Sequence, residues 1–467
     1  MSDSSNPQLV ELTPRVQQFV DNNFAKAIGE LGELVKIPGI AWPSFDANQL
    51  VLSAEKVKSL FDELGIFDFV EIRQSLKPSG ELGSPAVLAR RAARNGALHV
   101  LLYAHHDVQP PADAALWDSE PFIATLKGDR LFGRGASDDK AGIITHLYSL
   151  RALRDLSEST DLGITVFIEG EEEAGSESFS NFLSDNRADL AADLIVVADS
   201  GNWSIDTPAL TTSLRGMVSQ TFTVRTLDHA VHSGMFGGPL PDAMTAMIKL
   251  LASFHDELGN VAIEGLKSLD VEELPFSKEQ FAELSGLLPG VGTMGSESLL
   301  KHNWGAPALT VIGIDAPTVA LSSNTAQPEM TARVSLRLAP NQDPSEGLEL
   351  LRKHILGHAP FGAMVEFGHS EQGPGYLAKA GWGSDLAHEA FSLAWGAKSV
   401  SIGIGGSIPF ISEFAQVFPS AEILVTGVED PDSRAHSPNE SQHLPTLKRA
   451  IVAQSLILLH GNHLKRA

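Results

Sequence analysis

The sequence predicts an α/β fold in which a domain with a mixed β-sheet is interrupted by an inserted α+β domain. Three observations lead to this prediction. Strand patterns alternate with helical patterns in the first part of the chain and return at its end. Near Leu210 the order of strand and helix patterns becomes that of an α+β unit, and near Gly381 the chain returns to the first domain. With 467 residues, the chain is also too long for one ordinary domain.

We expect residues 1–208 and 383–467 to form the first domain and residues 209–382 the inserted one. In the first domain, apolar periodicity predicts helices over 14–35, 47–64, 140–156, 385–394 and 444–460. Short apolar, β-favouring runs predict its strands over 97–104, 163–168, 193–198 and 422–426. The inserted domain reads as strands 217–224, 308–314 and 330–338, helices 242–258 and 344–356, and a loop-rich stretch over 266–305.

Each of the four strands of the first domain leads into a polar cluster. His105, Glu169–Glu173 and Asp199 follow the first three strands, and the loop with His436 follows the fourth. Open α/β sheets bind ligands at the carboxyl ends of their strands. Six segments together supply the ligand set of a two-metal hydrolase: 103–110, 133–140, 169–175, 197–200, 231–234 and 434–440.

The spacing within these segments suggests roles. The Asp107 carboxylate, two residues after His105, can accept that imidazole's second N–H while the other ring nitrogen binds metal. Asp138 lies in a Gly-rich turn before a helix and can offer one oxygen to each of two cations. Glu172 and Glu173 are adjacent and diverge, so one can bind metal while the other handles a proton. His106 is expected to pack or to form a hydrogen bond.

In this order, the segments resemble the M20 family of metallopeptidases, from about Ile28 to the C-terminus. Asp107–Pro110, Trp117–Phe122, Gly405–Pro409 and Ala435–Glu440 resemble its dipeptidase and carnosinase branch. The resemblance implies a homodimer with two divalent metal ions per subunit, held in the catalytic domain. It also implies that the inserted domain serves as a lid and in dimerisation.

By this resemblance, His105 and Asp199 hold one metal, Glu173 and His436 hold the other, and Asp138 bridges them. The peptide bond after Asp138 is expected to be cis. Zinc is the expected metal, although mixed carboxylate and imidazole ligands suit Mn and Co as well.

The same resemblance assigns the remaining site residues. Glu172 is the general base and acid, and Asp107 orients His105. His232 reaches across the dimer to polarise the scissile carbonyl. Four residues are expected to contact the substrate, the first through its carboxylate: Arg337, Gly406, Ser407 and Asn324.

Composition limits the partners. The net charge of −24 argues against nucleic acid and anionic membranes. Without cysteine, thiol chemistry is excluded. The polar start lacks the features of a signal peptide, and no apolar run approaches the roughly 18 residues of a membrane span. We therefore expect a cytoplasmic protein.

The expected reaction is hydrolysis of dipeptides or short peptides with a free carboxylate, by a metal-bridged water with Glu172 as the base. An N-acyl-amino-acid deacylase of the same family is the alternative, because it shares all the metal ligands. A metal-binding scaffold without activity is a third possibility. It would need neither Glu172 nor His232 nor Asp107, which are all present.

Overall fold

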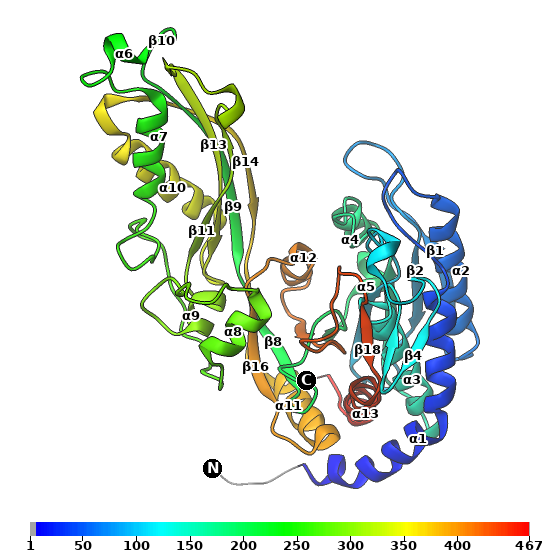
Figure 1. Ribbon diagram of the computed structural model, residues 1–467. Helices are drawn as coiled ribbons and strands as arrows, with labels where there is room; N and C mark the ends of the chain where they lie inside the picture. Colours follow the sequence, from blue (N-terminus) through cyan, green and yellow to red (C-terminus); the bar gives the residue numbers. More distant parts are fainter. Residues whose placement is uncertain (1–5, 467) are drawn as a thin grey trace. The chain divides into compact units, whose positions relative to one another are not determined.

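The computed structural model describes residues 6–466, which form two compact units (Figure 1). The first contains the described chain up to Thr212, Ala378–Ile402 and the chain from Glu413 onward. The second contains Ser213–Leu377 and Gly403–Ser412. The sequence predicts boundaries at 208 and 382, with all of residues 383–467 in the first domain. Gly403–Ser412 belongs there because Arg215 Nε donates to the Gly405 carbonyl and Ser407 Oγ donates to the Arg215 carbonyl.

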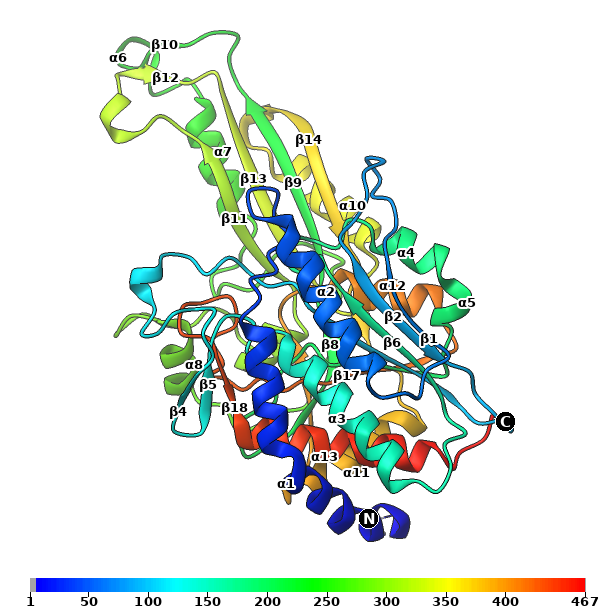
Figure 2. The same ribbon diagram turned by 90° about the vertical axis from the view of Figure 1, so that its right-hand side faces the viewer.

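The first unit is built on a mixed sheet with the strand order β1-β2-β6-β3-β7-β17-β8. Figure 2 shows β1, β2 and β6 side by side at one end of this sheet. The neighbours β6, β3, β7 and β17 are parallel, so their carboxyl ends share one edge. This confirms the predicted α/β fold. The strands are β1 (Phe69–Arg73), β2 (Ala86–Arg91), β3 (His99–His105), β6 (Gly163–Glu169), β7 (Leu194–Val197), β8 (Ala209–Leu214) and β17 (Glu422–Val425).

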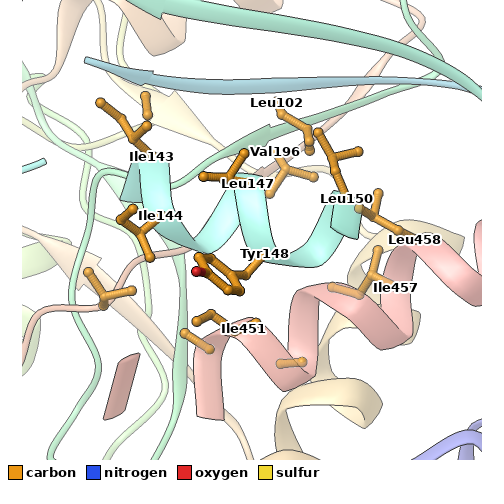
Figure 3. Packing of buried hydrophobic residues seen from close by; sticks show 14 of the residues in the cluster. Leu102, Ile143, Ile144, Leu147, Tyr148, Leu150, Val196, Ile451, Ile457 and Leu458 are labelled. Carbon is orange, nitrogen blue, oxygen red and sulfur yellow. The ribbon is translucent and has the colours of Figure 1, made fainter. Parts of the chain in front are cut away.

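Helix α3 (Lys140–Leu156) lies between this sheet and α13 (Leu444–Gly461). In Figure 3, Leu147 points toward Val196 of β7, and Tyr148 points toward Ile451 of α13. All residues from Lys140 to Leu153 are buried, and each large apolar side chain contributes roughly 1.5–3 kcal/mol by its burial. The start of α3, directly after Asp138 and Asp139, is therefore firmly placed. The other helices of this unit are α1 (Pro7–Val35), α2 (Ala47–Asp62), α4 (Phe179–Asp185), α5 (Arg187–Leu190), α11 (Trp382–Trp395) and most of α12 (Pro409–Val417).

A small sheet joins two loops of the first unit. Its order is β18-β5-β4, with β4 (Thr125–Lys127), β5 (Arg130–Phe132) and β18 (Ser441–His443). The antiparallel pairing of β5 with β18 places the segment after residue 132 beside the segment before residue 441. These are the loops of Asp138 and His436.

The second unit has an antiparallel sheet with the order β11-β13-β9-β14. Alternate residues of β13, such as Val334 and Leu336, are buried under α7 and α10, whereas Arg333 and Arg337 point to the opposite face. This alternation is typical of a sheet covered on one side. The elements are β9 (Gly216–Arg225), β11 (Ala308–Asp315), β13 (Glu329–Leu338), β14 (Met364–Gly373), α7 (Ala243–Ala252), α8 (Lys278–Ser285), α9 (Leu299–Trp304) and α10 (Pro344–His358).

Some predicted elements differ in extent. Helix α1 begins at Pro7 rather than at 14, because Asn6 caps it and proline suits the first helical turn. Helix α7 ends at Ala252 rather than at 258, where Asp256 caps a turn that contains the positive-φ residue Gly259. The strands β15 (Tyr376–Leu377) and β16 (Val400–Ile404) pair with β8. Of the helices in the described part of the chain, none combines the length and apolar character that a membrane span needs.

Candidate metal centre

Two groups of acidic and imidazole side chains lie at the carboxyl ends of the parallel strands in the first unit. In each group, one potential ligand atom from every residue lies within 4.8 Å of the others. The groups are His105, Glu172 and Asp199, and Asp138, Glu173 and His436. All five expected metal ligands and the expected general base are thus brought together.

Asp138 faces both groups. Its Oδ1 lies 3.1 Å from His105 Nε2, and its Oδ2 lies 3.0 Å from His436 Nε2. The same His436 nitrogen is 3.1 Å from Glu173 Oε2. The peptide bond between Asp138 and Asp139 is cis, as expected. One carboxylate therefore lies between two imidazoles, with one oxygen directed to each.

Asp107 contacts His105 and also holds the turn that follows β6. His105 Nδ1 is 3.1 Å from the Asp107 carbonyl oxygen and 3.4 Å from its carboxylate. The carboxylate accepts the backbone N–H groups of Glu172 and Glu173, at 3.2 and 3.1 Å. Asp107 therefore orients the His105 ring so that its Nε2 faces the carboxylates of Asp138 and Asp199. It also fixes the backbone of the two adjacent glutamates. The sequence does not predict the hydrogen bonds from the two glutamate N–H groups to Asp107.

Two further neighbours of the ligands have clear contacts. Gln109 donates its backbone N–H and its side-chain amide to the Glu173 carboxylate, at 3.1 and 2.7 Å. Sequence reasoning missed this role, and only the position of Gln109 in the Asp107–Pro110 motif pointed to it. His106 Nε2 lies 2.7 Å from the Pro85 carbonyl oxygen, so this buried ring forms a hydrogen bond away from the two groups.

The electrostatics of the centre reflect an excess of buried carboxylates. Burial, followed by the charge of Asp199, raises the pKa of Glu172 well above its usual range. Burial and Asp138 raise the pKa of Glu173. Hydrogen bonds to Asp138 and Glu173 raise the pKa of His436 to about 11. Such a cluster favours bound cations, and its oxygen and imidazole donors suit Zn, Mn or Co.

In the second unit, His232 and Asn324 lie side by side. His232 belongs to β10 (Val231–His232), which pairs with β12 (Thr325–Ala326) before the short helix α6 (Ser233–Phe236). The Ser233 N–H donates to the Asn324 carbonyl at 2.9 Å. His232 Nδ1 accepts the Gly234 N–H at 3.0 Å, which leaves the other ring nitrogen for a ligand.

Arg337 and Ser407 form a second pair in this unit. Arg337 Nη1 donates to Ser407 Oγ at 3.0 Å, and Gly406 precedes this serine. Within residues 6–466, no acidic side chain forms an ion pair with Arg337 or with its neighbour Arg215. Burial, with a contribution from Arg337, lowers the pKa of Arg215 to about 10. Two cations without an acidic partner make this place suitable for an anion.

The two pairs lie at opposite ends of one strand. His232 and Asn324 are next to the start of β13, and Arg337 is near its end. Figure 2 shows β10, α6 and β12 at one end of the long strands β9 and β13. Because β13 has ten residues, the pairs are separated by on the order of 30 Å.

Comparison with known proteins identifies the family. A family model described as peptidase family M20/M25/M40 matches residues 101–460. The chain belongs to this family. The M20 resemblance inferred from the six segments is therefore confirmed.

Individual M20 relatives agree with this assignment. A cysteinylglycine-S-conjugate dipeptidase from Corynebacterium striatum is 35% identical over 367 residues, covering 77% of this chain and 80% of its own length. A beta-Ala-His dipeptidase from Rattus norvegicus is 26% identical over 424 residues, covering 84% and 82%. The structure of an M20 metallo-carboxypeptidase from Sulfolobus solfataricus has a TM-score of 0.76 at 23% identity, covering 94% of this chain and 99% of its own.

Proposed function

We propose that this M20 family member hydrolyses dipeptides or short peptides with a free carboxylate, using two divalent metal ions per subunit. The observation that carries the proposal is Asp138, whose two oxygens face two imidazoles in two adjacent donor groups. The dipeptidases among its relatives support the choice of substrate.

In this proposal, His105 and Asp199 hold one metal, Glu173 and His436 hold the other, and Asp138 is shared. When bound, the ions act as Lewis acids and lower the pKa of a water to about 7. Zinc is the proposed metal, with Mn and Co as alternatives.

Glu172 is the proposed general base and acid. Its carboxylate accepts the proton of the attacking water and passes it to the amine that leaves. The support is positional: a carboxylate oxygen of Glu172 lies within 4.8 Å of ligand atoms of His105 and Asp199. Asp107 keeps Glu172 there by accepting its backbone N–H.

Arg337 is proposed to bind the substrate carboxylate. A guanidinium can offer two parallel N–H donors to a carboxylate, and Arg337 has no acidic partner in the described chain. Ser407 and Gly406 would line this place. Asn324, which lies beside His232, would add a polar contact to the substrate of the partner subunit.

His232 is proposed to act on the substrate of the partner subunit in a homodimer. A dipeptide spans about 7 Å, so one substrate cannot contact Arg337 and His232 of the same chain across roughly 30 Å. The end of the unit that carries His232 also exposes apolar side chains that a second copy could cover, namely Met235 at 76% and Val319 at 92%.

A substrate panel tests the proposal. The apoprotein, loaded with Zn, Mn or Co, is assayed on dipeptides and on N-acetyl amino acids. We expect turnover of dipeptides, with little activity on the acyl amino acids. The opposite preference would identify the deacylase alternative, and metal binding without turnover of either class would identify a scaffold. A cytoplasmic location stays a prediction from the sequence.

A further inference from the structure

Glu440, the last residue of the segment that carries His436, has no role in the reaction proposed above. Its side chain is 0% exposed, and four N–H groups donate to its carboxylate. Arg134 Nη1 and the Gly135 amide reach Oε2 at 2.6 and 3.0 Å. The amides of Ser137 and Asp138 reach Oε1 at 3.0 and 3.1 Å.

These contacts favour the ionised form of Glu440 and act against burial, which raises the pKa of this carboxyl. Every one of the four partners is a donor, so both carboxylate oxygens act only as acceptors. Hydrogen bonds to an ionised acceptor are roughly twice as strong as neutral ones. Glutamine has the same shape, but its N–H₂ group would replace one of the two oxygens and face two donors without accepting a hydrogen bond from either.

Glu440 also joins the loop of Asp138 to the loop of His436. The Gly133 N–H donates to the Glu440 carbonyl at 3.0 Å, and Arg134 Nη2 donates to the Ser437 carbonyl at 3.3 Å. The pairing of β5 with β18 continues this connection. The backbone of Asp138 is thus held from the loop that carries His436.

We propose that Glu440 is a positioning residue that fixes the backbone of Asp138 and thereby sets the affinity for both metal ions. The inference rests on the proposed function, in which Asp138 is the ligand that the two ions share. A shift of its backbone displaces both oxygens, which lie only 3.1 and 3.0 Å from His105 and His436. A residue that holds one unshared ligand would instead affect one ion first.

The test measures metal binding rather than turnover. Apoprotein of the wild type and of Glu440→Gln is titrated with Zn²⁺ against a chromophoric chelator, and with Co²⁺ by its visible absorption. Changes to residues that orient metal ligands cost about 10- to 100-fold in affinity. We expect both dissociation constants of Glu440→Gln to rise by that factor and the Co²⁺ spectrum of both sites to change.

Asp430→Asn is the matched control. Asp430 is also a buried carboxylate paired with an arginine, in the same stretch of chain before His436. Its carboxylate accepts hydrogen bonds from Arg130, the Asp432 N–H and the Ser433 hydroxyl, and none of these residues is a proposed metal ligand. We expect this variant to lose thermal stability as apoprotein, with both dissociation constants close to those of the wild type.

The outcomes separate the inference from the proposed function. A wild type that binds fewer than two ions contradicts the proposed function. Two ions in the wild type, with unchanged dissociation constants in Glu440→Gln or equal losses in Asp430→Asn, overturn the role of Glu440. If Glu440→Gln does not fold, Glu440→Asp replaces it. That variant keeps the charge opposite Arg134 with a shorter side chain, and unchanged affinity in it also overturns the inference.

Discussion

The two units arrange their candidate residues in opposite ways. In the first unit, residues from five distant segments converge. Four of the segments follow adjacent parallel strands that end at the same edge of the sheet, and the pairing of β5 with β18 brings the loop of Asp138 beside that of His436. In the second unit, His232 and Arg337 lie at opposite ends of a ten-residue antiparallel strand. A role in the first unit can therefore be tested within one chain, whereas the joint action of His232 and Arg337 on one substrate requires two chains.

The largest effect is expected for Asp138→Ala. In the proposal, Asp138 is the only ligand that serves both ions, so its loss removes or weakens both. Lewis-acid stabilisation is worth several kcal/mol, so activity should fall by roughly a thousandfold or more. Metal content measured by mass spectrometry, and anomalous scattering from crystals, check the result.

Single-metal variants provide the comparison for Asp138. Asp199→Ala and His436→Ala should each lose one ion first, because in the proposal each of these side chains holds only one ion. A fully occupied pair of ions in Asp138→Ala would contradict the bridging role.

Glu172→Gln should separate proton transfer from metal binding. We expect kcat to fall by roughly 100-fold or more, the lower range for general acid–base catalysis. The metal content should remain nearly intact. Because Glu172 lies in the same group as His105 and Asp199, loss of an ion in this variant would instead identify Glu172 as a ligand.

His232 offers the test that distinguishes the two units most directly. His232→Ala and Glu172→Ala chains should each be nearly inactive. Loss of a donor that polarises the scissile carbonyl costs about 100- to 1000-fold, and loss of the general base costs roughly 100-fold or more. After the chains are mixed and allowed to exchange, heterodimers contain one site with an intact Glu172 and an intact His232. Activity should rise clearly above both parents. Proven subunit exchange without any gain would place His232 within its own site or outside the reaction.

The same difference explains what could be predicted from the sequence. In the first unit, the four predicted strands are apolar runs that lead into polar clusters, so local pattern and site location coincide there. Helix α3 occupies the predicted range 140–156, and its residues from Lys140 to Leu153 are all buried. The ordered segments then suggested which of these polar residues meet.

Contacts between distant segments were beyond local pattern. The Asp107–Pro110 motif marks Gln109 but does not indicate that its amide reaches Glu173, and nothing near Glu440 indicates the four donors around it. In the second unit, Arg215 lies before a strand, and its place beside Arg337 depends on Gly403–Ser412 returning to this unit. Such contacts follow from the tertiary fold, so they cannot be predicted from the periodicity of apolar residues, which reports only on local structure.

The smallest effect is expected for Arg337→Lys, with Arg333→Lys as its control on the same face of β13. Lysine keeps the charge but loses the paired donors of the guanidinium, so KM for dipeptides should rise roughly tenfold with kcat little changed. Arg333 already has an acidic partner, with its Nη2 2.7 Å from Glu371 Oε2, and its change should leave KM unaltered.

An N-terminally free dipeptide with an amidated C-terminus gives the second readout, because it lacks the carboxylate. For that substrate, wild type and Arg337→Lys should have similar KM values. Equal KM values for both lysine variants on ordinary dipeptides would mean that Arg337 binds no substrate carboxylate, and the second unit would then lack its proposed anion site.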